Sequence, residues 1–227
     1  MEPYLTVAIP TMKRWSFLKD NLDIYLHRPE VGEVLICDET GEDVNMIARS
    51  RYRHNPKLRL IINDTILGIY RNKVQCMKKA RFPWIALLDS DDYFMDDWFD
   101  KLKKVLVKSN PKQIYTSSSF ITSNIDTTAT AMPTSSFEDY KINNLNWNSF
   151  VKLRSWNMLF HGNWVLSKEV CDVLDPTKRN VEGVESMYML REFIKNGYEV
   201  WYVPGLHYIH TTYSTKPAIR ATVSWAI

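Results

Sequence analysis

The segment Trp84-Ile85-Ala86-Leu87-Leu88-Asp89-Ser90-Asp91-Asp92 indicates more about the architecture of this chain than any other. Its first five residues are apolar and predict a buried strand, and three carboxylates follow within four positions. Like charges at this spacing repel one another unless a cation lies among them. Oxygen ligands at the end of a strand suit Mg²⁺ or Mn²⁺, which combine one or two carboxylates with substrate phosphates. The segment therefore predicts a metal and phosphate site; the alternative is a solvated acidic turn that caps the next helix.

The first 108 residues alternate between short apolar runs and segments with helical spacing. Apolar residues in the segment 69–80 follow a helical period, which leaves its lysines, Lys73 among them, on the other sides. The strands are expected at Leu5–Ile9, Glu33–Cys37, Leu58–Ile62 and Trp84–Leu88, and the helices at Trp15–Leu26, Asp43–Tyr52, Ile69–Ala80 and Met95–Lys108. Strands that alternate with helices predict right-handed crossovers and a mainly parallel sheet.

The pattern changes after Pro111. Between Thr116 and Ser136, twelve of twenty-one residues are Ser or Thr, which favours short edge strands and a long loop over a linker between domains. Further elements are expected as a helix Ser167–Leu174 with Ser167 as its N-cap, a helix Glu185–Asn196 that Gly197 ends, and a last strand Glu199–Val203.

Composition excludes several classes of protein. The net charge of +3 over 227 residues is too small and too evenly spread for nucleic acid to be the main partner. Cys37, Cys76 and Cys171 are odd in number and lie among apolar residues, which is typical of reduced thiols in the cytoplasm. No leader opens the chain, and no apolar run approaches the roughly eighteen residues of a membrane span. We therefore expect a soluble cytoplasmic protein without a transmembrane segment; attachment to a membrane surface is left open.

Four motifs in order resemble those of the family-2-type glycosyltransferases of the GT-A fold, which are inverting enzymes with a DxD motif. They are Pro10-Thr11 and Asp38-Glu39 after strands, Gly68 followed by Arg71-Asn72, and Asp89-Ser90-Asp91-Asp92. The resemblance covers roughly Leu5 to Gly205. It implies an α/β fold of GT-A type, a Rossmann-like, mainly parallel sheet flanked by helices, with a smaller mixed region on the acceptor side. Residues 1–227 would form a single domain, with a nucleotide-sugar-binding half (1–108) and an acceptor-binding half (109–227).

The same resemblance implies the donor site. Asp91 would bind the metal ion, Mn²⁺ or Mg²⁺, and the remaining donor-binding residues would be Pro10, Thr11, Asp38, Glu39, Arg71, Asp89 and Asp92. In the family the acidic pair contacts the nucleotide base. Because a carboxylate only accepts hydrogen bonds, it favours a base with a ring N–H, namely uracil, thymine or guanine. For the acidic pair a turn is the structural alternative, and for Arg71 a surface position on a basic helix.

Glycosyl transfer also needs a base for the proton of the acceptor hydroxyl. The family has a Glu-Asp pair at the start of a helix, where this chain has Glu185-Ser186, and Ser186 cannot act as a base at neutral pH. Glu185 is the first candidate for the catalytic base and Glu182 the second. Either can instead be an acid at a helix N-terminus, which the helix dipole favours.

Three further residues complete the predicted site. The resemblance suggests His210 as a second metal ligand, although a histidine among aromatic residues is often a packing residue. Asn163 and Trp164 would face the acceptor and offer a hydrogen bond and a sugar-stacking face, with core packing as the alternative for Trp164.

The predicted function is metal-dependent, inverting transfer of a hexosyl or deoxyhexosyl group from a nucleotide-diphosphate sugar to a glycan, glycoprotein or other hydroxyl acceptor. A UDP-sugar is the favoured donor, with dTDP- and GDP-sugars as alternatives. Two other functions stay open: a catalytically impaired nucleotide-sugar-binding module, which Ser186 would support, and a nucleotidyltransferase, although the segment Thr11–Trp15 lacks the glycines expected there. A haloacid dehalogenase-type phosphohydrolase is disfavoured. That family has its acidic motif close to the N-terminus, whereas the motif of this chain follows three predicted strands.

Overall fold

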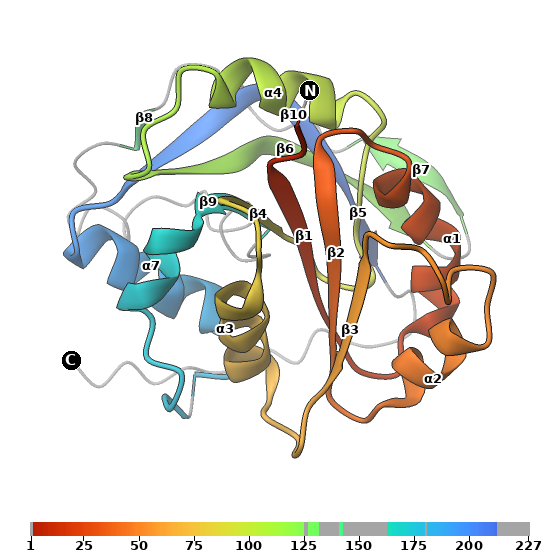
Figure 1. The fold of residues 1–227 in the computed structure, drawn as a ribbon. Coiled ribbons are helices and arrows are strands. Elements are labelled where there is room, and N and C mark those ends of the chain that lie inside the picture. Colours follow the sequence, from red (N-terminus) through yellow and green to blue (C-terminus); the bar gives the residue numbers. More distant parts are fainter. Residues whose placement is uncertain (1, 125–126, 132–140, 143–162, 180, 213–227) are drawn as a thin grey trace.

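A computed structural model describes residues 2–124, 127–131, 141–142, 163–179 and 181–212 (Figure 1). The strands are β1 (Leu5–Thr11), β2 (Val31–Asp38), β3 (Leu58–Ile62), β4 (Trp84–Leu87), β5 (Tyr93–Phe94), β6 (Gln113–Asn124), β7 (Thr127–Ala131), β8 (Lys141–Ile142), β9 (Trp164–Ser167) and β10 (Glu199–Thr212). The helices are α1 (Trp15–Leu26), α2 (Glu42–Ala48), α3 (Ile69–Lys79), α4 (Trp98–Leu106), the 3₁₀ helix η1 (Lys168–Val173) and α7 (Glu185–Lys195).

One sheet runs through the molecule in the order β3-β2-β1-β4-β9-β6-β10-β5. Its first four strands are all parallel, whereas β9 runs antiparallel to both β4 and β6. The prediction of a mainly parallel α/β sheet with a mixed second region is confirmed. The register Ala8 to Leu87 brings the carboxyl ends of β1 and β4 side by side. The segments that follow these two strands therefore meet at one edge of the sheet.

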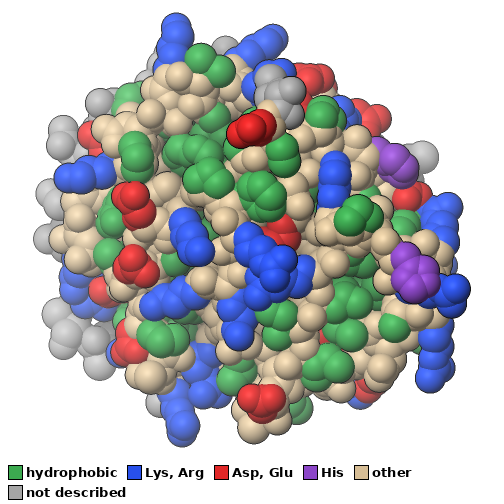
Figure 2. All heavy atoms as spheres, viewed as in Figure 1, with side chains coloured by type: hydrophobic (Ala, Val, Ile, Leu, Met, Phe, Trp, Pro, Cys, Tyr) green, Lys and Arg blue, Asp and Glu red, His purple; other side chains and the backbone are tan. Residues whose placement is uncertain are grey.

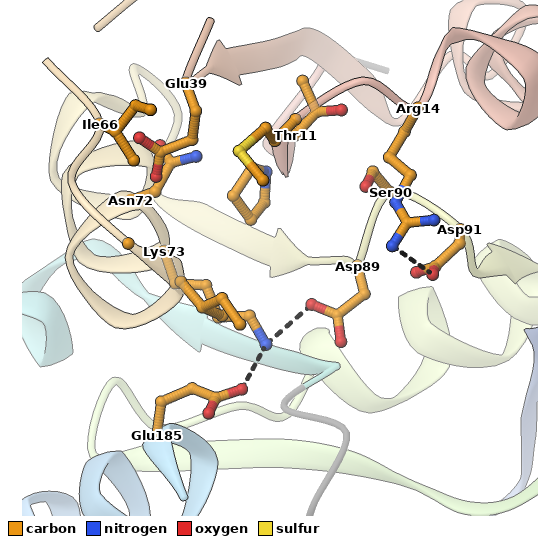
Figure 3. A pocket seen from close by; sticks show the side chains of 14 residues that line it. Thr11, Arg14, Glu39, Ile66, Asn72, Lys73, Asp89, Ser90, Asp91 and Glu185 are labelled. Carbon is orange, nitrogen blue, oxygen red and sulfur yellow. Dashed lines mark ion pairs between the residues drawn. The ribbon is translucent and has the colours of Figure 1, made fainter. Parts of the chain in front are cut away.

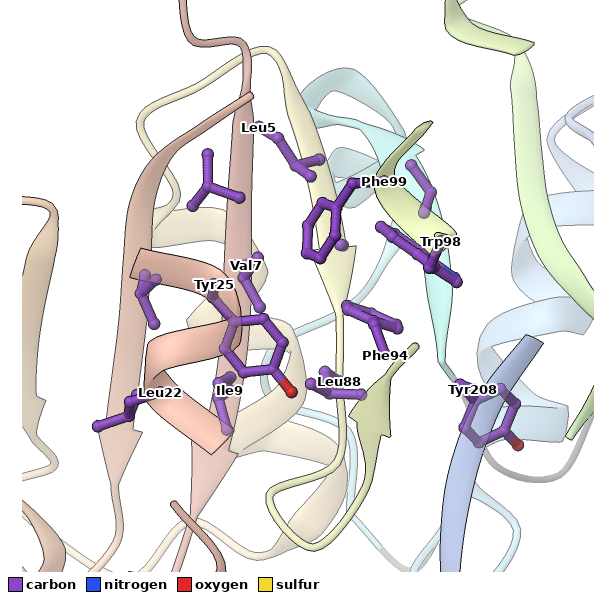
Figure 4. Close-up of a cluster of buried hydrophobic side chains, with 14 of the residues drawn as sticks. Leu5, Val7, Ile9, Leu22, Tyr25, Leu88, Phe94, Trp98, Phe99 and Tyr208 are labelled. Atoms are coloured by element: carbon purple, nitrogen blue, oxygen red, sulfur yellow. The ribbon is translucent and has the colours of Figure 1, made fainter. Parts of the chain in front are cut away.

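The core has two parts because successive residues of a strand point to opposite faces of the sheet. Leu5, Val7 and Ile9 of β1 pack with residues of α1 and α4, as Figure 4 shows. Ala8 points to the other face and joins the cluster under α3, η1 and α7. Figure 1 shows α3 and α7 on one side of the sheet and α1 and α2 on the other. Helix layers on both faces explain why these strands are apolar along their whole length.

The second half differs from the sequence expectation in three ways. β6 is a strand of twelve residues between β9 and β10, where short edge strands were predicted. The last strand continues past Val203 to Thr212, with a register shift between Val203 and His207. The predicted helix Ser167–Leu174 is the 3₁₀ segment η1, and Ser167 does not cap it, since its hydroxyl donates to the carbonyl of Pro111 at 2.9 Å. Strand pairing and this contact override the local preferences.

The surface carries both signs of charge. Figure 2, viewed as in Figure 1, shows Lys and Arg side chains gathered near the centre of this face, with Asp and Glu side chains around them. This mixture agrees with the small net charge. Cys37, Cys76 and Cys171 are all buried and free. Within the described ranges, no helix combines the length and the apolar character needed to cross a membrane.

Candidate active site

A pocket of about 350 Å³ lies at the carboxyl ends of β1 and β4 (Figure 3). Ligands of open α/β sheets bind at this edge. Its walls are formed by Pro10, Thr11, Met12, Arg14, Glu39, Ile66, Gly68, Ile69, Asn72, Lys73, Asp89, Ser90, Asp91 and Glu185. The pocket thus brings together residues from β1 to the first residue of α7, and most of the predicted donor-binding motifs contribute to it.

The three carboxylates of the turn after β4 have separate partners. Asp89 Oδ1 lies 2.8 Å from Lys73 Nζ, and Asp91 Oδ2 lies 3.8 Å from Arg14 Nη2 (Figure 3). Asp92 is 2% exposed and is bound from within the protein. Cations of the protein thus lie beside Asp89 and Asp91, which lowers the repulsion within this acidic segment. A metal ion bound at Asp91 stays a prediction.

Asp92 holds the turn from the inside. Its Oδ1 accepts a hydrogen bond from the backbone N–H of Thr211 at 3.1 Å and lies 3.0 Å from Nδ1 of His210. Burial lowers the pKa of His210, but Asp92, with smaller contributions from Asp91 and Asp89, raises it above its ordinary value. His210 was predicted as a second metal ligand beside Asp91; its Nδ1 pairs with Asp92, and the metal role stays a prediction. Asp92, predicted to bind the donor, is a buried anchor between the turn and β10.

Asn163 and Trp164 do not offer their side chains to an acceptor. The Asn163 side chain accepts a hydrogen bond from the backbone N–H of Asp89 at 3.0 Å and donates one to Asp92 Oδ2 at 2.8 Å. Trp164 is 1% exposed, and its ring lies edge-on to Phe193 at a centroid distance of 5.5 Å. The prediction of an acceptor contact is therefore corrected for both. Asn163 braces the acidic turn, and Trp164 packs in the core.

Lys73 joins two walls of the pocket. It is 3% exposed, and its Nζ lies 2.8 Å from Asp89 Oδ1 and 3.5 Å from Glu185 Oε1 (Figure 3). Burial alone would lower the pKa of Lys73, but Asp89 and Glu185 raise it above its ordinary value. The pKa of Asp89 rises to about 6, because burial raises it most, Lys73 opposes this, and Asp92 and Asp91 add to the rise.

Lys73 was predicted on a different side of its helix from the apolar residues. The spacing contains a signal against this, since Tyr70, Lys73 and Met77 lie three and four residues apart on one face of α3. All three are buried. A lysine within a buried stripe marks a site where a carboxylate must be close.

The turn between β1 and α1 is held by Asp43, which the sequence pattern predicted only as the start of a helix. Asp43 Oδ2 accepts a hydrogen bond from the Thr11 hydroxyl at 2.6 Å, and Oδ1 accepts one from the backbone N–H of Arg14 at 2.8 Å. Between them Lys13 has a φ of 59°, in the left-handed region that non-glycine residues rarely adopt. Such backbone strain often accompanies a functional site. Here the turn that contains Lys13 places Arg14 beside Asp91.

The two acidic residues at the carboxyl end of β2, Asp38 and Glu39, have different surroundings. Asp38 is fully buried, and its carboxylate accepts hydrogen bonds from the backbone N–H groups of Thr40 and Val44, both at 3.0 Å. Its predicted contact with the nucleotide is therefore corrected: Asp38 shapes the turn. Glu39 lies in the pocket wall, and its Oε2 accepts a hydrogen bond from the backbone N–H of Leu67 at 2.6 Å.

The Arg71-Asn72 motif places Asn72, rather than Arg71, in the pocket wall. The Nε of Arg71 donates to the carbonyl of Leu67 at 2.6 Å, one turn earlier in the chain. Asn72 donates to the carbonyl of Cys37 at 3.0 Å and accepts from Asn63 at 3.0 Å. The motif therefore ties α3 to the end of β2.

The two candidate bases lie in different places. Glu185 lines the pocket, whereas Glu182 is exposed and its Oε2 accepts a hydrogen bond from the backbone N–H of Tyr70 at 3.3 Å. Ser186 is 1% exposed, and its hydroxyl has no hydrogen-bond partner among the described residues. Of these three residues, Glu185 alone lines the pocket.

Within the described residues, no group of three or more His, Cys, Asp and Glu side chains is arranged to hold a metal ion. Asp91, however, presents its carboxylate to the pocket. A divalent ion bound together with a diphosphate needs only one or two carboxylates, because phosphate oxygens and waters complete its coordination. The residues present therefore fit a metal ion that arrives with such a ligand, and Asp91 is the residue that would hold it.

Residues 6–172 match the model of a family described as glycosyl transferase family 2. The chain belongs to this family. The resemblance read from its four motifs is thus confirmed. The family 2 match includes the acidic turn and ends before Glu182 and Glu185, so it leaves the assignment of the base as a prediction.

Solved structures of two other proteins, TarS and GalNAc-T7, share the fold of this family 2 chain. Residues 1–349 of TarS from S. aureus have a TM-score of 0.65 and 16% identity, over 93% of this chain and 60% of that one. The same TarS segment has been crystallised in complex with UDP-GlcNAc and with UDP. GalNAc-T7, crystallised with UDP, GalNAc and Mn²⁺, has a TM-score of 0.70 and 14% identity, over 93% of this chain and 44% of that one.

These likenesses confirm the GT-A fold. The chain spans about 60% of the length of the TarS segment it matches. No curated protein matches the sequence significantly.

Proposed function

We propose that this family 2 domain transfers a sugar from a nucleotide-diphosphate sugar to a hydroxyl group of an acceptor, with inversion at the anomeric carbon. One observation carries the proposal. A single pocket is lined by Glu39, a candidate for contact with the base, by Asp89 and Asp91, which suit a diphosphate that arrives with a divalent ion, and by Glu185. The crystallised complexes of TarS with UDP-GlcNAc and of GalNAc-T7 with UDP, GalNAc and Mn²⁺ support the choice of donor class.

Glu39 is the residue that would recognise the base. Its Oε2 already accepts the N–H of Leu67 at 2.6 Å, which fixes the side chain and leaves the other oxygen as an acceptor. Because an ionised carboxylate cannot donate, it pairs with the ring N–H of uracil and not with the bare ring nitrogen of cytosine. A UDP-sugar is therefore the proposed donor, with dTDP- and GDP-sugars as alternatives that also offer a ring N–H.

Arg14 and Asp91 would lie near the diphosphate. A divalent ion held by Asp91, Mn²⁺ or Mg²⁺, would neutralise the charge that grows on the leaving diphosphate. Arg14 lies beside Asp91 in the pocket wall and can pair with phosphate oxygens through its planar fork.

Glu185 would act as the base. The acceptor oxygen forms a bond to the anomeric carbon, while the bond from that carbon to the diphosphate breaks and its electron pair leaves with the diphosphate. The acceptor proton passes to the Glu185 carboxylate. A single displacement of this kind inverts the anomeric configuration and forms no covalent bond between sugar and protein.

The test is calorimetric titration with UDP-, dTDP- and GDP-sugars, with Mn²⁺ and with chelator, followed by an assay of donor hydrolysis. Binding of a UDP-sugar that requires the metal ion, together with metal-dependent hydrolysis, is the expected result. Tight binding without hydrolysis or transfer to any acceptor would instead identify a nucleotide-sugar-binding module, the alternative that Ser186 favours. If no nucleotide-diphosphate sugar binds, the proposal is wrong.

A further inference from the structure

Lys73 is a buried charge in the wall of the pocket. Its side chain is 3% exposed although it lies in the middle of α3. Removing an ammonium group from water is costly unless anionic partners compensate for the lost hydration. Lys73 has two such partners, Asp89 at 2.8 Å and Glu185 at 3.5 Å. Its position is therefore defined by carboxylates on two other elements of the fold.

The two carboxylates have different roles in the proposed reaction, one in binding the donor and the other in deprotonating the acceptor. Asp89 follows β4 and lies among the groups proposed to bind the donor, and Glu185 begins α7 and is the proposed base. The ammonium of Lys73 lies between them (Figure 3). Since one group contacts both, the separation of the base from the donor side depends on where α3 holds Lys73.

Glu182 attaches the segment before α7 to the same helix. Its carboxylate accepts the N–H of Tyr70 at the start of α3. Gly68 makes room for this contact, because a Cβ there would lie 2.4 Å from Glu182 Oε1, and its φ of 85° favours glycine as well. The segment is thus tied to α3 at Glu182 and again at Glu185, three residues later. The second contact fixes a side chain that lines the pocket.

We propose that Lys73 is a positioning residue, which holds the Glu185 carboxylate at a fixed distance from the donor side of the pocket. The inference rests on the proposed function, in which Glu185 accepts the proton of the acceptor. In this proposal α3 both carries the Arg71-Asn72 motif and positions the Glu185 carboxylate. A misplaced base lowers the rate of the chemical step without weakening the binding of the donor. The effect of Lys73 should therefore depend on Glu185.

The decisive experiment is a double-mutant cycle between Lys73 and Glu185. Lys73→Met keeps the length of the side chain and removes its charge, and Glu185→Gln removes the base. Lys73→Met is expected to lower kcat about 10- to 100-fold, because misplaced catalytic groups lose up to this much. In the Glu185→Gln background, the same change is expected to alter kcat by no more than about twofold, since two residues that act as a unit are not additive.

Two controls separate positioning from other roles. Lys78→Met removes a lysine of the same helix that lies outside the pocket wall, and should leave kcat and the donor KM unchanged. Lys73→Arg keeps the charge in a different geometry and should give a kcat between those of wild type and Lys73→Met. Thermal melting of each variant checks that it is folded. If Lys73→Met does not fold, Lys73→Arg decides: a reduced kcat at an unchanged donor KM supports the proposal, and a wild-type kcat contradicts it.

Three results would overturn the inference. They are a wild-type kcat in folded Lys73→Met, a loss that appears in the donor KM in place of kcat, and a full additional loss in the Glu185→Gln background. Failure of the proposed function has a different signature, namely wild-type protein without donor hydrolysis or transfer. An active wild type, an inactive Glu185→Gln variant and an active Lys73→Met variant would refute the role of Lys73 alone.

Discussion

Acidic residues stand at the carboxyl ends of both β2 and β4, and in both turns the carboxylates divide between two tasks. After β2, Asp38 is fully buried and accepts backbone N–H groups, while Glu39 lines the pocket. After β4, Asp92 is buried and bound by the protein, while Asp89 and Asp91 line the pocket. One carboxylate in each turn therefore fixes the backbone that presents its neighbours.

The turns differ in the partners of the carboxylates. The carboxylate of Asp38 is satisfied by N–H groups of its own loop, so the contacts of this buried acid are local. Asp92 is satisfied by Asn163 and by His210 and Thr211 of β10, so the turn after β4 depends on distant parts of the chain. We infer that the first turn would tolerate loss of its buried acid better than the second.

The largest effect is expected at Asp91, which faces the pocket. Asp91→Ala should lower kcat/KM for the donor by about 100-fold or more, because it removes the residue proposed to hold the metal ion that stabilises the leaving group. Titration of the variant with a UDP-sugar and Mn²⁺ should show no binding that depends on the metal. Asp64→Ala, which removes an exposed acid of the loop before α3, is the matched control. Wild-type titration curves for Asp91→Ala would contradict the assignment.

Asp92 should be the more important residue for stability. Asp92→Ala leaves the N–H of Thr211, the amide of Asn163 and the ring of His210 without their partner. Removing one member of such a buried network costs about 3 kcal/mol of unfolding free energy. Urea unfolding followed by fluorescence measures this loss. The same measurement on Asp91→Ala should give a change below about 0.5 kcal/mol, because its ion pair is partly exposed. Equal losses of unfolding free energy in Asp92→Ala and Asp91→Ala would contradict the assignment of Asp92 as the stabilising residue of the turn.

Loss of the Asp38 carboxylate should destabilise the fold less than loss of the Asp92 carboxylate. Asp38→Ala leaves two backbone N–H groups unpaired in a partly buried turn, and we expect a loss of about 2 kcal/mol of unfolding free energy. Once folded, the variant should bind the donor within about twofold of wild type, since Asp38 does not face the pocket. Urea unfolding and donor titration on the same preparation check both expectations. A large loss of donor affinity in a stably folded variant would show that Asp38 does contribute to the nucleotide site.

Local patterns predicted much of this arrangement from sequence. The apolar run Trp84–Leu88 gave β4, and the acidic residues after it lie at the edge of the sheet where the pocket opens. The helical spacing of the segment 69–80 gave α3 within one residue at its end. Such features depend on neighbours in the chain, which is why the sequence reports them well.

Contacts between distant residues set the limits of the prediction. Lys73 was placed away from the apolar side of its helix because its carboxylate partners, Asp89 and Glu185, lie on other elements. Asn163 was assigned to the acceptor because nothing in the local sequence indicates that its amide braces the turn after β4. Asp43 resembles any acid in the first turn of a helix until Thr11 and Arg14 fold onto it. In each of these three cases the polar side chain has a partner more than ten positions away in the chain.

The smallest and most specific effect is expected at Glu39. Glu39→Gln keeps an oxygen that can accept the N–H of Leu67, so stability should change little. The new amide can donate a hydrogen bond, which a carboxylate cannot, and it should weaken UDP binding about tenfold while binding of CDP improves relative to UDP. Competition titrations with UDP and CDP measure the ratio directly. Asp38→Asn is the control, because it makes the same chemical change in the buried member of the pair and should leave the ratio as it is. If both variants or neither shift the preference, then the pocket-facing acid does not read the base, and the division of tasks within the turn after β2 would have no functional consequence.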